Sequence, residues 1–92
     1  MAANYRTRMA RGDRSVVPPA VRTCGELVRY FRLRAGMQQG TLAVRAGITQ
    51  SALSKVENDQ RRYVRESTIL AIVGALGLDA QRAADLMSRR VS

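Results

Sequence analysis

Apolar residues recur every three or four positions along most of the chain, which is the spacing of an amphipathic helix. The pattern predicts five helices, at residues 23–35, 39–46, 49–57, 67–76 and 79–90. No segment alternates between apolar and polar residues as a half-buried strand would, and no internal repeat is visible. The sequence therefore predicts an all-α fold.

Capping residues mark where several of these helices begin. Thr23 is followed three residues later by Glu26, the spacing of a capping box. The hydroxyl of Thr49 is placed to accept from the backbone N–H of Ala52, and Asp79 precedes the last helix as a cap. The apolar positions expected to face the core are Leu27, Val28, Phe31, Ala35, Leu42, Ala43, Ala46, Leu53, Val56, Ile69, Ile72, Val73, Leu76, Ala83, Leu86 and Met87.

The second and third predicted helices are short, and they are joined through Gly47, Ile48 and Thr49. Gly47 suits the left-handed backbone that often ends a helix, and Ile48 fills the space between the two helices. This is the spacing of a helix-turn-helix. One face of the third helix is polar and carries Gln50, Ser51, Ser54, Lys55 and Asn58. The pattern alone leaves open an ordinary surface helix whose polar face is simply solvated.

The charge of the chain favours a negatively charged partner. Sixteen basic residues oppose seven acidic ones, which gives a formal net charge of +9 over 92 residues. Such a balance is typical of domains that bind nucleic acid. Lys55, on the polar face of the third helix, is the single lysine.

The first part of the chain, residues 1–22, is interpreted as a flexible basic arm that precedes one domain at residues 23–92. The arm has almost no apolar periodicity, and its Pro18-Pro19 pair discourages helix before it. Its expected role is to follow DNA phosphates or enter a minor groove, and the alternative is an inert tail. The arginines concerned are Arg6, Arg8, Arg11 and Arg14.

The residue types that many metal sites and active sites use are rare or absent in the sequence. Cys24 is the single cysteine and there is no histidine, so we expect no disulfide framework, no zinc site and no nucleophile–base pair. We therefore expect no catalysis, no metal, no cofactor and no small-molecule ligand. No apolar run reaches the length of a membrane span and the N-terminus lacks an apolar signal core, so the expected location is the cytoplasm.

The stretch from about Glu26 to Leu78 resembles the Cro/phage-repressor, or XRE-like, family of helix-turn-helix DNA-binding domains. The resemblance is carried by Arg32 with "AGM", by "QGTLAVRAGITQSALSKVEN" and by "ILAIVGALGL". It implies a compact five-helix bundle of the lambda-repressor-like type. It also implies that the third helix enters the DNA major groove, usually in a homodimer on a palindromic site.

The resemblance assigns roles to individual residues. It implies that the base-reading positions are Gln50, Ser51, Lys55 and, secondarily, Ser54. Their chemistry agrees, since Gln suits adenine, Lys donates to guanine, and Ser serves either. Arg32 and Glu57 match a structural ion pair that joins the first helix to the third. The residues that match the family's phosphate contacts are Gln39, Asn58, Gln60, Arg61 and Arg62.

The sequence is compatible with two functions. The first is a sequence-specific DNA-binding transcriptional regulator that acts as a repressor. Such a protein would be encoded by a bacterium or a phage and would be associated with the nucleoid in the cytoplasm. The alternative is an antitoxin or another protein-interaction module that neutralises or recruits a partner protein.

Two departures from the family pattern concern the second helix: Gln38 replaces a Ser or Thr cap, and Gly40 lies in the first turn. Glycine there costs about 0.5–1 kcal/mol against alanine, so this helix is expected to be less firm.

Overall fold

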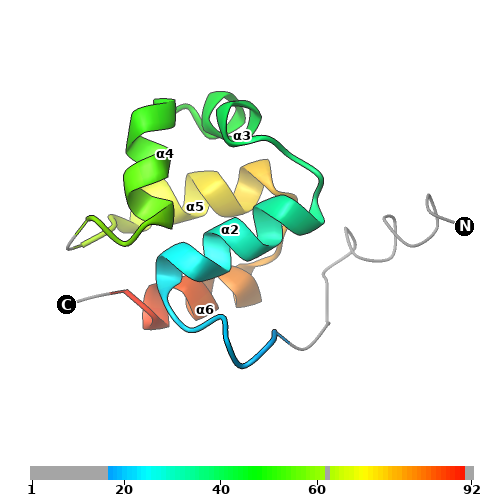
Figure 1. Cartoon of the computed structure of the whole chain (residues 1–92), viewed down its shortest axis with the longest axis vertical. Helices are drawn as coiled ribbons and strands as arrows, with labels where there is room; N and C mark the ends of the chain where they lie inside the picture. The colour runs from blue at the N-terminus through cyan, green and yellow to red at the C-terminus, as the bar shows by residue number, and fades with distance from the viewer. Residues whose placement is uncertain (1–16, 62, 91–92) are drawn as a thin grey trace, which may run out of the picture.

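The computed structural model describes residues 17–61 and 63–90, and within them it contains five helices and no strand (Figure 1). The predicted all-α fold is confirmed. The helices are α2 (Cys24–Arg34), α3 (Gln39–Ala46), α4 (Gln50–Glu57), α5 (Glu66–Ala75) and α6 (Ala80–Ser88).

The helices pack around one apolar core. In Figure 1, α3 and α4 lie at one end of the bundle, α6 lies at the other, and α2 and α5 run between them. α2 packs on α4 and α6, and α5 packs on α3 and α6. Aliphatic side chains dominate the core, and the largest ones that are fully buried are Leu27, Leu42, Leu53, Ile69, Ile72, Leu86, Val28 and Val56.

The predicted caps are present. Thr23 and Glu26 form the capping box, in which the Thr23 hydroxyl accepts from the Glu26 N–H at 3.0 Å and the Glu26 carboxylate accepts from the Thr23 N–H at 3.1 Å. The backbone N–H groups of Arg22 and Thr23, which both donate to the Glu26 carboxylate, hold the pKa of this carboxyl below its usual range. Thr49 caps α4 through the N–H of Ala52 at 3.0 Å.

Two other sequence signals behave as expected at helix ends. Asp79 caps α6 by accepting from the N–H of Arg82 at 3.2 Å. Gly47 ends α3 in the left-handed conformation, with φ of 72°. The chain can therefore turn sharply between α3 and α4.

Three details differ from the sequence prediction. α5 lies one residue earlier than predicted, and α6 ends at Ser88 rather than near Arg90. Arg89 leaves the helical conformation, and its guanidinium donates to the Val21 carbonyl at 2.9 Å. Ala35 was expected in the core, but it is the C-cap of α2 and is exposed.

The last six residues of the expected arm, 17–22, belong to the described chain, and three of them contact the domain: the Arg22 N–H donates to the Glu26 carboxylate at 2.9 Å, and two valines pack on the core. Val17 and Val21 are half-buried against the core. The remainder of the arm, including Arg6, Arg8, Arg11 and Arg14, lies outside the described residues.

Cys24 is a free, buried thiol at the beginning of α2. Burial, reinforced by the negative charge of Asp59, raises the pKa of this thiol from 9.0 to about 11, against the opposing charges of Arg90 and Arg89. The folded state therefore favours the neutral thiol more strongly than the unfolded state does.

This shift makes part of the stability depend on pH. Because the folded-state pKa is raised, the contribution is complete below pH 9 and is lost as the pH rises towards 11. We expect the difference in melting temperature between the wild type and Cys24→Ala to shrink over that window. Thermal melts of both proteins at matched pH values would measure it, and a constant difference would contradict the prediction.

Candidate nucleic-acid interface

One face of α4 is anchored in the core and the other is open. Leu53 and Val56 are buried on the inner face. Among the predicted base-reading residues, Gln50, Ser51 and Lys55 are exposed, whereas Ser54 is half-buried. The arrangement follows from helical spacing, and it leaves a polar surface formed by short side chains and one lysine.

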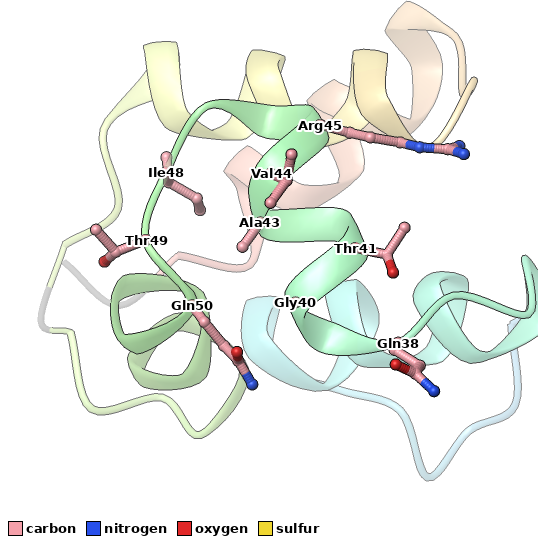
Figure 2. A pocket seen from close by; sticks show the side chains of 9 residues that line it. All are labelled: Gln38, Gly40, Thr41, Ala43, Val44, Arg45, Ile48, Thr49 and Gln50. Atoms are coloured by element: carbon pink, nitrogen blue, oxygen red, sulfur yellow. The ribbon is translucent and has the colours of Figure 1, made fainter.

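α3 and the start of α4 border an open depression of about 700 Å³. Figure 2 shows Gln38 and Gln50 projecting on the same side of this depression, while Arg45 points away from Gln50. Gly40 lies on its wall, and a Cβ added there would come within 3.2 Å of the Gln50 side-chain oxygen Oε1. The missing side chain of Gly40 thus leaves room for Gln50.

The first turn of α3 has no side-chain cap. Gln38 occupies the N-cap position in an extended conformation, and its side chain makes no capping hydrogen bond. The first backbone N–H groups of a helix have no intrahelical acceptor, and they attract anions. This helix end can therefore receive a phosphate oxygen, which is the contact expected near Gln39.

Arg32 and Glu57 meet as a fork-to-fork pair between α2 and α4. The Arg32 Nε donates to Glu57 Oε2 at 2.6 Å, and its Nη2 donates to Oε1 at 3.0 Å. Both residues are buried, with 9% and 5% of their surfaces exposed. The third guanidinium nitrogen donates to the Met37 carbonyl at 3.0 Å. This charge-assisted bonding fixes the end of α4 against α2.

Gln39 connects this pair to the open face of α4. Its amide Nε2 donates to Glu57 Oε1 at 3.2 Å, and its Oε1 accepts from Gln50 Nε2 at 3.5 Å. Sequence reasoning expected a phosphate contact for Gln39 but did not foresee these bonds. A chain of side chains therefore runs from a buried charge to a predicted base-reading residue.

The predicted phosphate contacts after α4 lie in an exposed loop. Asn58, Gln60 and Arg61 are all exposed. The Asn58 side chain donates to the Ser54 carbonyl at 3.0 Å, and the Gln60 N–H donates to the Lys55 carbonyl at 2.8 Å. Arg62, the fifth predicted phosphate contact, lies outside the described residues.

Sequence reasoning missed the way this loop is held. The Asp59 carboxylate accepts from the Thr23 hydroxyl at 2.6 Å and from the Gly25 N–H at 3.0 Å. Gly25 is buried so tightly that an added Cβ would lie 2.3 Å from the Val56 carbonyl oxygen. Real Cβ atoms do not approach a backbone oxygen that closely, so only glycine lets α2 meet the end of α4 in this way. The sequence gives no local signal for either contact, because the partners are more than thirty residues apart.

Arginines near the C-terminal end have partners within the domain. Arg82 forms an ion pair with Asp85 at 3.1 Å and lies over the Phe31 ring at 4.9 Å. Arg90 donates to the Val64 carbonyl at 3.1 Å and lies 4.5 Å from the centre of the Tyr63 ring. These cations fasten α6 to α2 and to the segment after α4.

Within residues 17–61 and 63–90, no three His, Cys, Asp or Glu side chains are grouped so that they could hold a metal ion. In the same part of the chain, no helix is long and apolar enough to cross a membrane.

The geometry agrees with comparisons to known proteins. A family model described as a helix-turn-helix domain matches residues 23–86, which include all five helices apart from the last residues of α6. A search of curated protein sequences gave no match.

Several solved structures share the fold. The restriction-modification controller protein C.AhdI from Aeromonas hydrophila is 29% identical, with a TM-score of 0.63, over 72% of this chain and 98% of its own. The clp gene regulator ClgR from C. glutamicum is 21% identical, with a TM-score of 0.64, over 78% and 92% of the two chains. The restriction-modification controller protein C.Esp1396I is 18% identical, with a TM-score of 0.62, over 78% and 91%.

Proposed function

The chain belongs to the helix-turn-helix domain family, and on this premise we propose that it is a sequence-specific DNA-binding transcriptional regulator that inserts α4 into the major groove. The observation that carries the proposal is the open face of α4, where Gln50, Ser51 and Lys55 are exposed while the opposite face is anchored in the core. The similarity to proteins described as a controller protein and a gene regulator supports a role in transcription.

In this proposal, the exposed side chains of α4 contact the edges of the bases. Lys55 donates to guanine O6 and N7, Gln50 pairs with an adenine edge, and Ser51 accepts or donates as the base requires. Ser54, half-buried beside Asn58, has a secondary role. Because Ser51 and Ala52 are small, the helix can lie close to the base edges.

Phosphate contacts fix the register of α4 in the groove. The uncapped first turn of α3 receives one phosphate near Gln39, and the exposed loop of Asn58, Gln60 and Arg61 receives another, with Arg62 added by its place in the sequence. Such contacts position a protein on DNA without reading its sequence. The buried pair of Arg32 and Glu57 keeps the two contact sites in a fixed relation.

The regulator acts as a homodimer on a palindromic site in this proposal, with half-sites about 34–36 Å apart, one helical turn of DNA. Residues 1–22 serve as a basic arm along the phosphates. The proposal involves neither catalysis nor a cofactor. It places the protein in the cytoplasm, bound to DNA, where it represses transcription.

Selection of binding sites from random double-stranded DNA tests this function. We expect one palindromic sequence to be enriched, which would define both the site and the dimer. Absence of enrichment would overturn the proposal and would favour the alternative, a module that binds a partner protein.

Gly40→Ala tests whether the room beside Gln50 matters for DNA reading. The added Cβ removes the flexibility of glycine and should stabilise the protein by about 0.4–1 kcal/mol. It would also meet the Gln50 side-chain oxygen at 3.2 Å, so the end of the Gln50 side chain must shift by a few tenths of an ångström. We expect weaker binding to the selected site by at most about 0.5–1.5 kcal/mol, the cost of a side-chain torsion that is displaced by about 30° from its preferred value. Thermal melts and titration of a labelled duplex measure the two effects.

Gly74→Ala is the matched control for this prediction. Gly74 is an exposed glycine of α5, and an added Cβ there would meet nothing within 4 Å. It should raise the melting temperature and leave DNA binding unchanged. Equal DNA binding by both variants would contradict a role for the space beside Gln50.

A further inference from the structure

The loop that follows α4 is tied to the beginning of α2 by one side chain. The two donors to the Asp59 carboxylate are the hydroxyl of Thr23, which is the N-cap of α2, and the N–H of Gly25 in its first turn. Backbone N–H groups at this end of a helix lack intrahelical acceptors. Asp59 therefore serves as a second cap of α2, supplied from 34 residues further along the chain.

The backbone of Asp59 is unusual as well. Among the described residues other than glycine, it alone has a positive φ, of 56°. Aspartate and asparagine tolerate this left-handed conformation better than most residues, and glycine adopts it with the least strain. Glycine would lack the carboxylate that reaches α2, so the strain and the contact occur together at this one position.

Asp59 lies among the residues proposed to bind DNA phosphate. Asn58 precedes it, Gln60 and Arg61 follow it, and all three are exposed. A carboxylate repels phosphate, so on charge alone Asp59 should weaken DNA binding. A favourable effect of Asp59 on DNA binding that outweighs this repulsion would explain why an aspartate occupies the loop.

We propose that Asp59 is a positioning residue for DNA binding: by its bonds to Thr23 and Gly25 it holds the phosphate loop, residues 58–61, in the conformation that meets the DNA backbone. The inference rests on the proposed function, since it explains how the phosphate contacts of that function are arranged. Asp59 itself does not touch DNA.

Asp59→Gly and Asp59→Asn separate positioning from charge. Both remove the negative charge and both suit the left-handed backbone, but only asparagine keeps polar atoms within reach of Thr23 and Gly25. We expect Asp59→Gly to bind the duplex recovered by selection about tenfold more weakly than the wild type, and Asp59→Asn to bind as tightly or more tightly. The salt dependence of log K should flatten by about 0.9 for each phosphate contact that Asp59→Gly loses.

Asp79→Ala is the control for a purely structural effect. It removes the side-chain cap of α6. It should lower the melting temperature while leaving the affinity and the salt dependence unchanged. If Asp59→Gly is folded and binds with wild-type affinity and salt dependence, the positioning role is overturned. If instead the selection enriches no sequence for the wild type, the proposed function itself fails, so the two failures are distinguishable.

A second pair of variants decides the question if Asp59→Gly does not fold. Thr23→Ala removes one of the two partners of Asp59, and Thr23→Ser keeps the hydroxyl. A flatter salt dependence for Thr23→Ala but not for Thr23→Ser supports the proposal. The same salt dependence for both variants overturns it.

Discussion

Arg32→Ala is expected to lower the free energy of unfolding by about 3–5 kcal/mol, because it leaves the carboxylate of Glu57 buried without its cation. Glu57 is only 5% exposed, and Gln39 would remain as its one described side-chain donor. Chemical denaturation followed by circular dichroism measures the loss. A domain of this size has little stability to spare, so the variant should be partly unfolded near body temperature.

Arg29→Ala is the matched control, since Arg29 lies on the same helix and is exposed. Its loss should change stability by no more than about 0.5 kcal/mol. Arg34 is a poorer control, because it bonds the Tyr30 hydroxyl at 2.6 Å. Similar melting temperatures for Arg32→Ala and Arg29→Ala would show that the buried pair is not structural. Removing both Arg32 and Glu57 should cost less than the sum of the two single changes, because no orphan charge remains.

Lys55→Ala and Gln50→Ala are expected to weaken binding to the selected DNA site by about 1–3 kcal/mol each and to relax the preference at about one or two base pairs. Both side chains are exposed on α4, and the proposed bidentate contact of either one with a base edge would carry sequence information. Binding to the selected duplex and to single-base variants of it, at one salt concentration, measures both effects.

Arg29→Ala again supplies the control, since it removes the same unit of charge from α2 instead of α4. It should leave base preference untouched. If Lys55→Ala and Gln50→Ala bind every duplex more weakly by the same factor, these residues contact phosphates and do not read bases.

Local signals predicted most of the fold. Thr23, Thr49 and Asp79 mark helix starts because a side-chain oxygen satisfies a nearby N–H, and Gly47 marks a helix end because it tolerates a left-handed backbone. Each of these interactions spans only a few residues, so the sequence alone contains it. The end of α6 was misplaced because Arg89 leaves the helix and bonds Val21, 68 residues earlier in the chain.

The residues of the candidate site were predicted from two sources, the helical spacing and the family resemblance. Helical spacing placed Gln50, Ser51 and Lys55 on an open face, whereas the pairing of Arg32 with Glu57 came from the family resemblance. No periodic pattern connects two residues that lie 25 positions apart. For the same reason the bonds of Asp59 to α2 and the close approach at Gly25 were visible only in three dimensions.

α4 has only eight residues, and isolated helices shorter than about 12–15 residues are marginal in water. It is held instead from outside, by the turn from α3 at its beginning and by Arg32 and Gly25 of α2 at its end. A peptide copied from α4 would therefore not retain the conformation that is proposed to contact DNA. The concentration of active regulator in a cell then depends on the folded fraction of the whole domain. A substitution that destabilises the domain by about 1–2 kcal/mol, even at a position far from the DNA, is enough to change that concentration several-fold, because the unfolded chain is degraded.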